Sequence, residues 1–145
     1  MIIRNYNPVT DYPSIEVLLN APGTFGGQFD EARDTKERID ALELAKPRSI
    51  LVAELDGEIV GTVTLFEDGR SAWLYRFAVQ AEYESEITKL LNAAALETMK
   101  ARGHTQVLVY APQGDQHFEE RYAKLGFNQG NNLQRIGRIF GKVCG

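Results

Sequence analysis

The spacing of apolar residues over the first third of the chain predicts a strand followed by two helices. Residues 1–6 alternate weakly, as a strand does, and a short helix capped by Asp11 follows. The apolar residues of this helix lie on one face: Ile15, Leu18 and Leu19. Residues 30–45 predict a second helix, and the proline and glycines of residues 21–28 predict a loop between the two. We expect these helices and their loop to form a lid, with Phe25 exposed at the middle of the loop.

From about residue 49 the spacing of apolar residues changes to a period near two, which is typical of strands. Residues 49–55 and 58–66 predict two strands joined by a tight Asp-Gly turn at 56–57. A second Asp-Gly turn at 68–69 leads to a strand over residues 71–79. Strict alternation would divide this strand between one face with Trp73, Tyr75, Phe77 and Val79 and another with Ala72, Leu74, Arg76 and Ala78. We therefore expect three antiparallel strands.

The rest of the chain predicts a long helix, a strand, a helix and final strands. The apolar face of the long helix recurs at helical spacing and comprises Ile87, Leu90, Leu91, Ala94, Ala95 and Thr98. Gly103 ends this helix, and a short buried strand follows over residues 105–110. Because a strand–helix–strand crossover is right-handed, this strand and the strand over 71–79 are expected to be parallel. A last helix covers 115–125, and final strands include Phe127 and residues 133–140.

Composition limits the class of protein. The length of 145 residues, with 43% apolar and 25% charged residues, suits one soluble globular domain over 1–145. No apolar run approaches the ~20 residues of a membrane helix, and no secretory signal opens the chain, so we expect a cytoplasmic protein without a membrane partner. A net charge of −4 with scattered basic residues argues against nucleic-acid binding. The only cysteine, Cys144, excludes an internal disulfide. His104, expected in an exposed turn, and His117 lack partners at ligand spacing, so no metal site is expected.

Two segments carry the most specific signal. Residues 122–127 read Tyr-Ala-Lys-Leu-Gly-Phe, and residues 77–83 read Phe-Ala-Val-Gln-Ala-Glu-Tyr. With the order of elements, they resemble the GNAT superfamily of N-acetyltransferases over nearly the whole chain. The resemblance implies a single-domain α/β fold with a mixed, mostly antiparallel sheet and helices on both faces. It also implies transfer of an acetyl group from acetyl-CoA, as co-substrate, to a small-molecule or peptide amine. Whether the chain forms a homodimer is left open.

The resemblance also assigns roles to particular residues. Backbone groups of three strand residues would line the pantetheine arm of the cofactor: Phe77, Ala78 and Val79. Tyr122 matches a tyrosine that acts as general acid toward the departing thiolate, although a tyrosine there can also be a packing residue. Asp115 stands where the family often has an asparagine, although its position favours a helix N-cap over a cofactor role. Lys124 is a candidate for supplying positive charge to the cofactor.

The segment expected to hold the cofactor pyrophosphate departs from the family pattern. Family members have a glycine-rich turn whose N–H groups bind phosphate at a helix N-terminus. Residues 84–89 contain no glycine, and the candidate cofactor-binding residues here are Ser85, Glu86, Ile87 and Thr88. Ser85 is the expected helix cap. Glu84 and Glu86 either repel phosphate or, as acidic residues of a first helical turn commonly do, point outward. This departure is the reason to keep an alternative function open, in which a GNAT-like fold has lost acyl transfer and serves as a binding or regulatory module.

Removal of the proton from the acceptor amine needs a base or a water path, because an alkyl amine has a pKa of about 10.4. Glu54, Glu67 and Asp68 lie on or next to the central hairpin, and no motif distinguishes one of them. The acceptor cleft is expected to include Trp73 or Tyr75, depending on which face of their strand is open.

Overall fold

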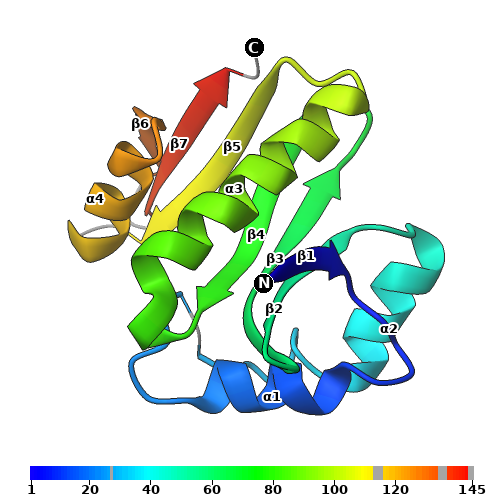
Figure 1. Ribbon diagram of the computed structural model, residues 1–145. Coiled ribbons are helices and arrows are strands. Elements are labelled where there is room, and N and C mark those ends of the chain that lie inside the picture. Colours follow the sequence, from blue (N-terminus) through cyan, green and yellow to red (C-terminus); the bar gives the residue numbers. More distant parts are fainter. Residues whose placement is uncertain (27, 113–115, 134–136, 144–145) are drawn as a thin grey trace. The chain divides into compact units, whose positions relative to one another are not determined.

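The computed structural model describes residues 1–26, 28–112, 116–133 and 137–143. Its elements (Figure 1) are β1 (Ile2–Asn5), α1 (Tyr12–Asn20), α2 (Lys36–Ala45), β2 (Ile50–Leu55), β3 (Glu58–Glu67), β4 (Ala72–Val79), the 3₁₀ turn η1 (Ala81–Tyr83), α3 (Glu84–Ala101), β5 (Gln106–Pro112), α4 (Gln116–Lys124), β6 (Asn128–Leu133) and β7 (Gly137–Val143). The fold is α/β, and its strands pair in both antiparallel and parallel fashion, as predicted. Within the described residues, no helix has the length and apolar character needed to cross a membrane.

The chain divides into two compact units. The first unit comprises residues 1–64 and 76–91, and the second comprises residues 65–75 and 92–145. The first therefore contains β1, β2, most of β3, both N-terminal helices, the last part of β4 and the first turns of α3. The second contains the end of β3, the first part of β4, the rest of α3, and β5 to β7 with α4.

The first unit is built on antiparallel pairing of β1 with β2 and of β2 with β3. The predicted tight turn between β2 and β3 is confirmed. Asp56 and Gly57 both have positive φ, 51° and 81°, which is the conformation of a two-residue hairpin turn. Asp-Gly pairs accept this conformation at low cost, so the local sequence alone determines the hairpin.

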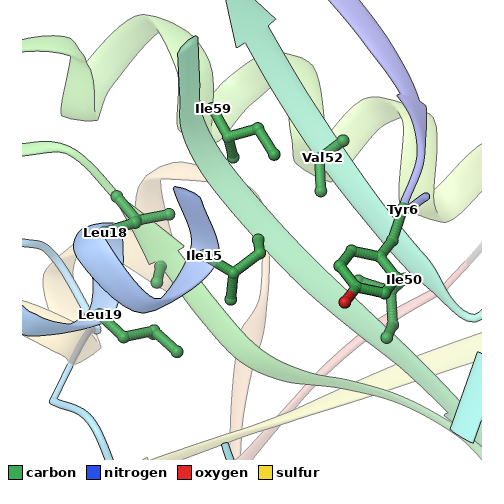
Figure 2. Packing of buried hydrophobic residues seen from close by; sticks show 8 residues of the cluster. Tyr6, Ile15, Leu18, Leu19, Ile50, Val52 and Ile59 are labelled. Carbon is green, nitrogen blue, oxygen red and sulfur yellow. The ribbon is translucent and has the colours of Figure 1, made fainter. Parts of the chain in front are cut away.

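The core of the first unit lies between α1 and the sheet (Figure 2). Its buried residues are Tyr6, Ile15, Leu18, Leu19, Ile50, Val52, Ile59 and Ala78. The predicted apolar face of α1 is thereby confirmed. The Tyr6 hydroxyl donates to Asp40 Oδ1 on α2 at 2.8 Å, and burial together with this bond raises the pKa of Tyr6. This bond gives the buried hydroxyl of Tyr6 the hydrogen-bond partner that a buried phenol needs, and it connects the chain just after β1 to α2.

Helix α2 is shorter than predicted. It begins at Lys36 rather than near residue 30, because Thr35 is its cap and accepts from Arg38 N–H at 3.4 Å. Asp30 instead closes a turn, in which its Oδ1 accepts from Ala32 N–H at 2.7 Å. The predicted end before Pro47 is confirmed.

The apolar face of α3 is displaced from the predicted one. Ile87, Leu91 and Ala95 are buried as expected, whereas Leu90 is 39% exposed. Ile87 and Leu91 rest directly on Gly61 of β3, where a Cβ atom would lie 2.8 Å from Leu91 Cδ1 and 2.9 Å from Ile87 Cγ2. This close approach determines which side of the helix faces the sheet, and a pattern of apolar residues cannot report it.

In the second unit, β4 and β5 are parallel, as predicted, with Trp73 opposite Leu108 and Leu74 opposite Val109. Strand β7 pairs antiparallel with both β5 and β6. The final strands differ from the expected ranges, because β6 covers 128–133 and β7 starts at Gly137. Helix α4 ends as predicted, with Gly126 at a φ of 89°. Asp115 and Cys144 lie outside the described residues.

Candidate active site

Strand β4 supplies the residues predicted to line the cofactor, and its backbone is interrupted at Arg76. Arg76 has a φ of 52°, a left-handed conformation that costs a residue with a Cβ atom roughly 1–2 kcal/mol. The strand alternates up to Tyr75, which is 40% exposed, and Phe77, Ala78 and Val79 are then all buried. The alternation of exposed and buried residues thus ends at Tyr75, and the positive φ of Arg76 turns the extended backbone at the next residue.

An ion pair holds Arg76 in this conformation. Its Nε donates to Asp34 Oδ1 at 2.9 Å, and its Nη2 bonds Asp34 Oδ2 and also Gln28 O, the latter at 2.8 Å. The Asp34 side chain is 3% exposed, and its Oδ2 also accepts from Asp30 N–H at 2.8 Å. The sequence does not predict this pair. The only sequence signal is a charged residue inside an otherwise apolar strand, which does not identify the partner.

Phe25 is buried, so the expectation of an exposed side chain at the middle of its loop is wrong. It is 4% exposed, and its backbone pairs with Val79 at the end of β4. Gly23 and Gly26, with φ values of 76° and 74°, flank it. These two left-handed glycines let the loop turn back toward β4, and the apolar ring of Phe25 then leaves solvent.

The N-terminus of α3 follows η1 without an intervening loop, and α3 begins at Glu84. Ser85 is thus already inside the helix, and its predicted role as a cap is wrong. Ser85 and Glu86 are exposed, whereas Ile87 and Thr88 are buried. Glu84 and Glu86 lie in the first helical turn, where acidic side chains are favoured by the helix dipole. The same position is the one expected to receive phosphate.

Tyr122 lies on α4 in the second unit and is 3% exposed. Its ring contacts Phe127 edge-on at a centroid distance of 5.6 Å and Phe118 at 6.2 Å. Burial raises the pKa of Tyr122, so the phenol stays protonated at neutral pH. This environment suits a packing residue and also preserves the proton that a general acid needs. Lys124, two residues later, is exposed.

The candidate bases each have a partner. Glu54 Oε1 accepts from Arg4 Nη2 at 3.2 Å. Asp68 accepts from the N–H groups of Arg70 and Ser71 at 2.9 and 2.8 Å, which lowers its pKa to about 2. A carboxylate with so low a pKa is a poor proton acceptor. The Asp68 carboxylate also already accepts the N–H groups of its own turn.

Glu67 is bound by a residue that was expected to be exposed. His104 Nε2 lies 2.8 Å from Glu67 Oε2, and the His104 side chain is only 12% exposed. Arg102 Nη1 lies 3.8 Å from the other oxygen. The prediction of an exposed His104 is wrong, because the turn after α3 brings it against the end of β3. Among the residues that the structure describes, no three His, Cys, Asp or Glu side chains gather as a metal site would require.

The second unit also has an apolar pocket of about 280 Å³ lined by Phe66, Trp73, Leu74 and Tyr75. Trp73 and Tyr75 share this open face of β4, as residues two apart on a strand do. Phe66 on β3 is 53% exposed. This is the face on which the acceptor cleft was expected if Trp73 and Tyr75 proved accessible.

Comparison with known families identifies the family of the chain. Residues 13–127 match the model of the acetyltransferase (GNAT) family. The chain belongs to the GNAT family of acetyltransferases. The match spans β4, the first turns of α3 and the Tyr122–Phe127 segment, and so confirms the resemblance that these segments carried. Comparison with curated protein sequences gives no match.

Solved GNAT structures share the fold at low sequence identity. The PaiA N-acetyltransferase of Thermoplasma acidophilum in complex with coenzyme A is 22% identical, with a TM-score of 0.81 and 98% of each chain covered. Ard1 of Thermoplasma volcanium is 19% identical, with a TM-score of 0.78 over 98% of this chain and 96% of that one. The ribosomal-protein-S18-alanine N-acetyltransferase of Escherichia coli is 12% identical, with a TM-score of 0.72 over 99% and 93%. At such identities these structures show the fold alone.

Proposed function

We propose that the chain is an acetyl-CoA-dependent N-acetyltransferase that acts on a small-molecule or peptide amine. The family match over residues 13–127 is the observation that carries this proposal, since it includes every segment to which a role in acyl transfer is assigned. A similar fold solved with coenzyme A supports the choice of cofactor. The alternative of a binding module without transferase activity rests on residues 84–89, which lack the family's glycines and carry Glu84 and Glu86.

The proposed reaction follows from the residues in three steps. The backbone of Phe77, Ala78 and Val79 binds the pantetheine arm and orients the thioester. The unprotonated amine attacks the thioester carbonyl, the carbon–sulfur bond breaks, and the amine proton leaves to water or to a base. Tyr122 would give its proton to the departing thiolate and then regain one from water. Burial raises the pKa of Tyr122, which keeps the phenol protonated beforehand but makes it a weaker acid, so the donation requires a direct hydrogen bond to the sulfur.

Phosphate would bind at the first N–H groups of α3, those of Ser85 and Glu86, because the N–H groups of Ile87 and Thr88 already donate within the helix. Lys124 is the candidate for supplying positive charge to the cofactor.

The acceptor pocket is assigned to the apolar face of β4. Its lining of Phe66, Trp73, Leu74 and Tyr75 offers aromatic and aliphatic surface. A volume of about 280 Å³ lies just below the range of roughly 300–1,000 Å³ that is usual for small-molecule sites, which favours a compact ligand group. We therefore expect an acceptor whose amine is attached to an apolar group, such as an arylalkylamine or a peptide with an apolar side chain.

Calorimetric titration with acetyl-CoA, followed by measurement of thiol release with a panel of amines, tests the proposal. We expect binding below millimolar concentration and faster turnover with an arylalkylamine than with a polyamine of similar basicity. Tyr75→Ala should raise KM for the arylalkylamine, and Tyr75→Phe, which keeps the ring, should not. No binding at millimolar acetyl-CoA would remove the transferase proposal and leave the binding module.

A further inference from the structure

Two backbone hydrogen bonds join the Phe25 loop, residues 21–26, to the end of β4. Phe25 N–H donates to Val79 O at 2.8 Å, and Val79 N–H donates to Phe25 O at 3.0 Å. This reciprocal pair is one rung of an antiparallel ladder. Both polar backbone groups of Val79 are therefore occupied by the chain itself.

This rung lies on the edge of β4 that points away from β3. The next residue, Gln80, donates its N–H to Val60 O on β3 at 2.8 Å. Backbone groups of successive strand residues point to opposite edges, so the groups of Val79 point to the edge that β3 does not cover. The Phe25 loop thus extends β4 sideways, as an added peptide strand does.

Contacts outside this rung hold the segment around Phe25 in place. The Phe25 side chain is 4% exposed, and Thr24 Oγ1 donates to Leu18 O at 2.9 Å. Further along the chain, Gln28 O accepts from Arg76 Nη2 at 2.8 Å. Thr24 and Phe25 within the loop, and Gln28 beyond it, are therefore each held by a hydrogen bond to another element.

We propose that the Phe25 loop competes with the acyl-CoA arm for the backbone edge of β4 at Val79. The inference rests on the proposed function, in which the pantetheine arm lies along Phe77, Ala78 and Val79. An amide-bearing arm binds a strand edge through N–H and C=O groups that are free to pair. The loop must therefore leave Val79 before acetyl-CoA binds, and the apparent affinity falls by the fraction of molecules in which the loop is detached.

Amide hydrogen exchange measured by NMR tests this on the wild-type protein. Without cofactor, the N–H groups of both Phe25 and Val79 should be protected. At saturating acetyl-CoA, Phe25 N–H should lose its protection while Val79 N–H keeps it, because the cofactor replaces the loop as its partner. Protection of Phe25 N–H that survives saturation would overturn the proposal, as would its absence in the free protein.

A pair of variants tests the same competition through affinity. Phe25→Pro removes the N–H donor and much of the buried side chain, and Phe25→Leu keeps the donor and an apolar side chain. Phe25→Pro loses one hydrogen bond and apolar burial, so the loop should detach from Val79 more often. Acetyl-CoA binding should then tighten on the order of tenfold. Phe25→Leu should remain near the wild-type affinity. If Phe25→Pro is unfolded by circular dichroism, Thr24→Ala, which removes one loop anchor, should give about a threefold gain.

These outcomes separate the loop proposal from the proposed function. Equal affinity of the wild type and the loosened variant, with acetyl transfer in both, would overturn the competition and leave the transferase intact. Tighter binding by the loosened variant without transfer to any amine would refute the transferase and support the competition. Absence of binding by every variant would overturn both.

Discussion

The ion pair between Arg76 and Asp34 is expected to stabilise the left-handed backbone of β4 at Arg76, and its removal tests this directly. The Asp34 carboxylate is 3% exposed and accepts two hydrogen bonds from Arg76. Arg76→Ala removes both of these bonds and leaves the buried carboxylate with the hydrogen bond from Asp30 N–H. Loss of one partner of a buried pair costs about 3–5 kcal/mol, so unfolding free energy should fall by that amount. For a chain of this length, Tm should fall by roughly 10 °C.

Alanine is chosen because it keeps the left-handed backbone at residue 76 as costly as arginine does, so the change reports the ion pair alone. Urea unfolding of Arg76→Ala, Asp34→Ala and the double variant measures the coupling. We expect the double variant to be more stable than Arg76→Ala, because it no longer contains the orphaned carboxylate. Losses that simply add in the double variant would refute a buried, coupled pair.

The exposed ion pair between Arg33 and Asp30 is the matched control in the same segment. Their side chains are 52% and 32% exposed. An exposed pair contributes about 0–1 kcal/mol, so Arg33→Ala should leave the unfolding midpoint nearly unchanged. A loss comparable to that of Arg76→Ala would mean that burial does not explain the difference.

Three further outcomes are expected. Tyr122→Phe should lower kcat about 10²-fold or more with little change in acetyl-CoA affinity, and unchanged turnover would exclude Tyr122 as the acid. Glu84→Arg combined with Glu86→Gly should tighten coenzyme A binding roughly tenfold and make it more salt-dependent, as titrations at two ionic strengths would show. Gly61→Ala should destabilise the protein by about 1–3 kcal/mol, because its new methyl group would lie 2.8 Å from Leu91 Cδ1. Unfolding indistinguishable from wild type would show that α3 can shift away from β3.

The sequence by itself predicted the elements whose causes are local. The Asp-Gly turn at 56–57 needs two left-handed residues, and both residue types accept that conformation. The spacing of apolar residues predicted the buried face of α1. A glycine predicted the end of α4 at Gly126, and the right-handed crossover predicted that β4 and β5 are parallel. The segments 77–83 and 122–127, together with the order of elements, predicted the family that the match over residues 13–127 confirms.

Only the tertiary structure decided the contacts that shape the candidate site. Arg76 and Asp34 are separated by 42 positions, and His104 and Glu67 by 37, so no local pattern joins either pair. Phe25 was expected to be exposed because glycines and a proline surround it, yet those glycines allow the turn that buries it against β4. Residue patterns report which segments are apolar or able to turn. Which strand edge a loop covers depends on how distant segments pack. The free energy of that packing comes from contacts between segments and cannot be read from any one of them.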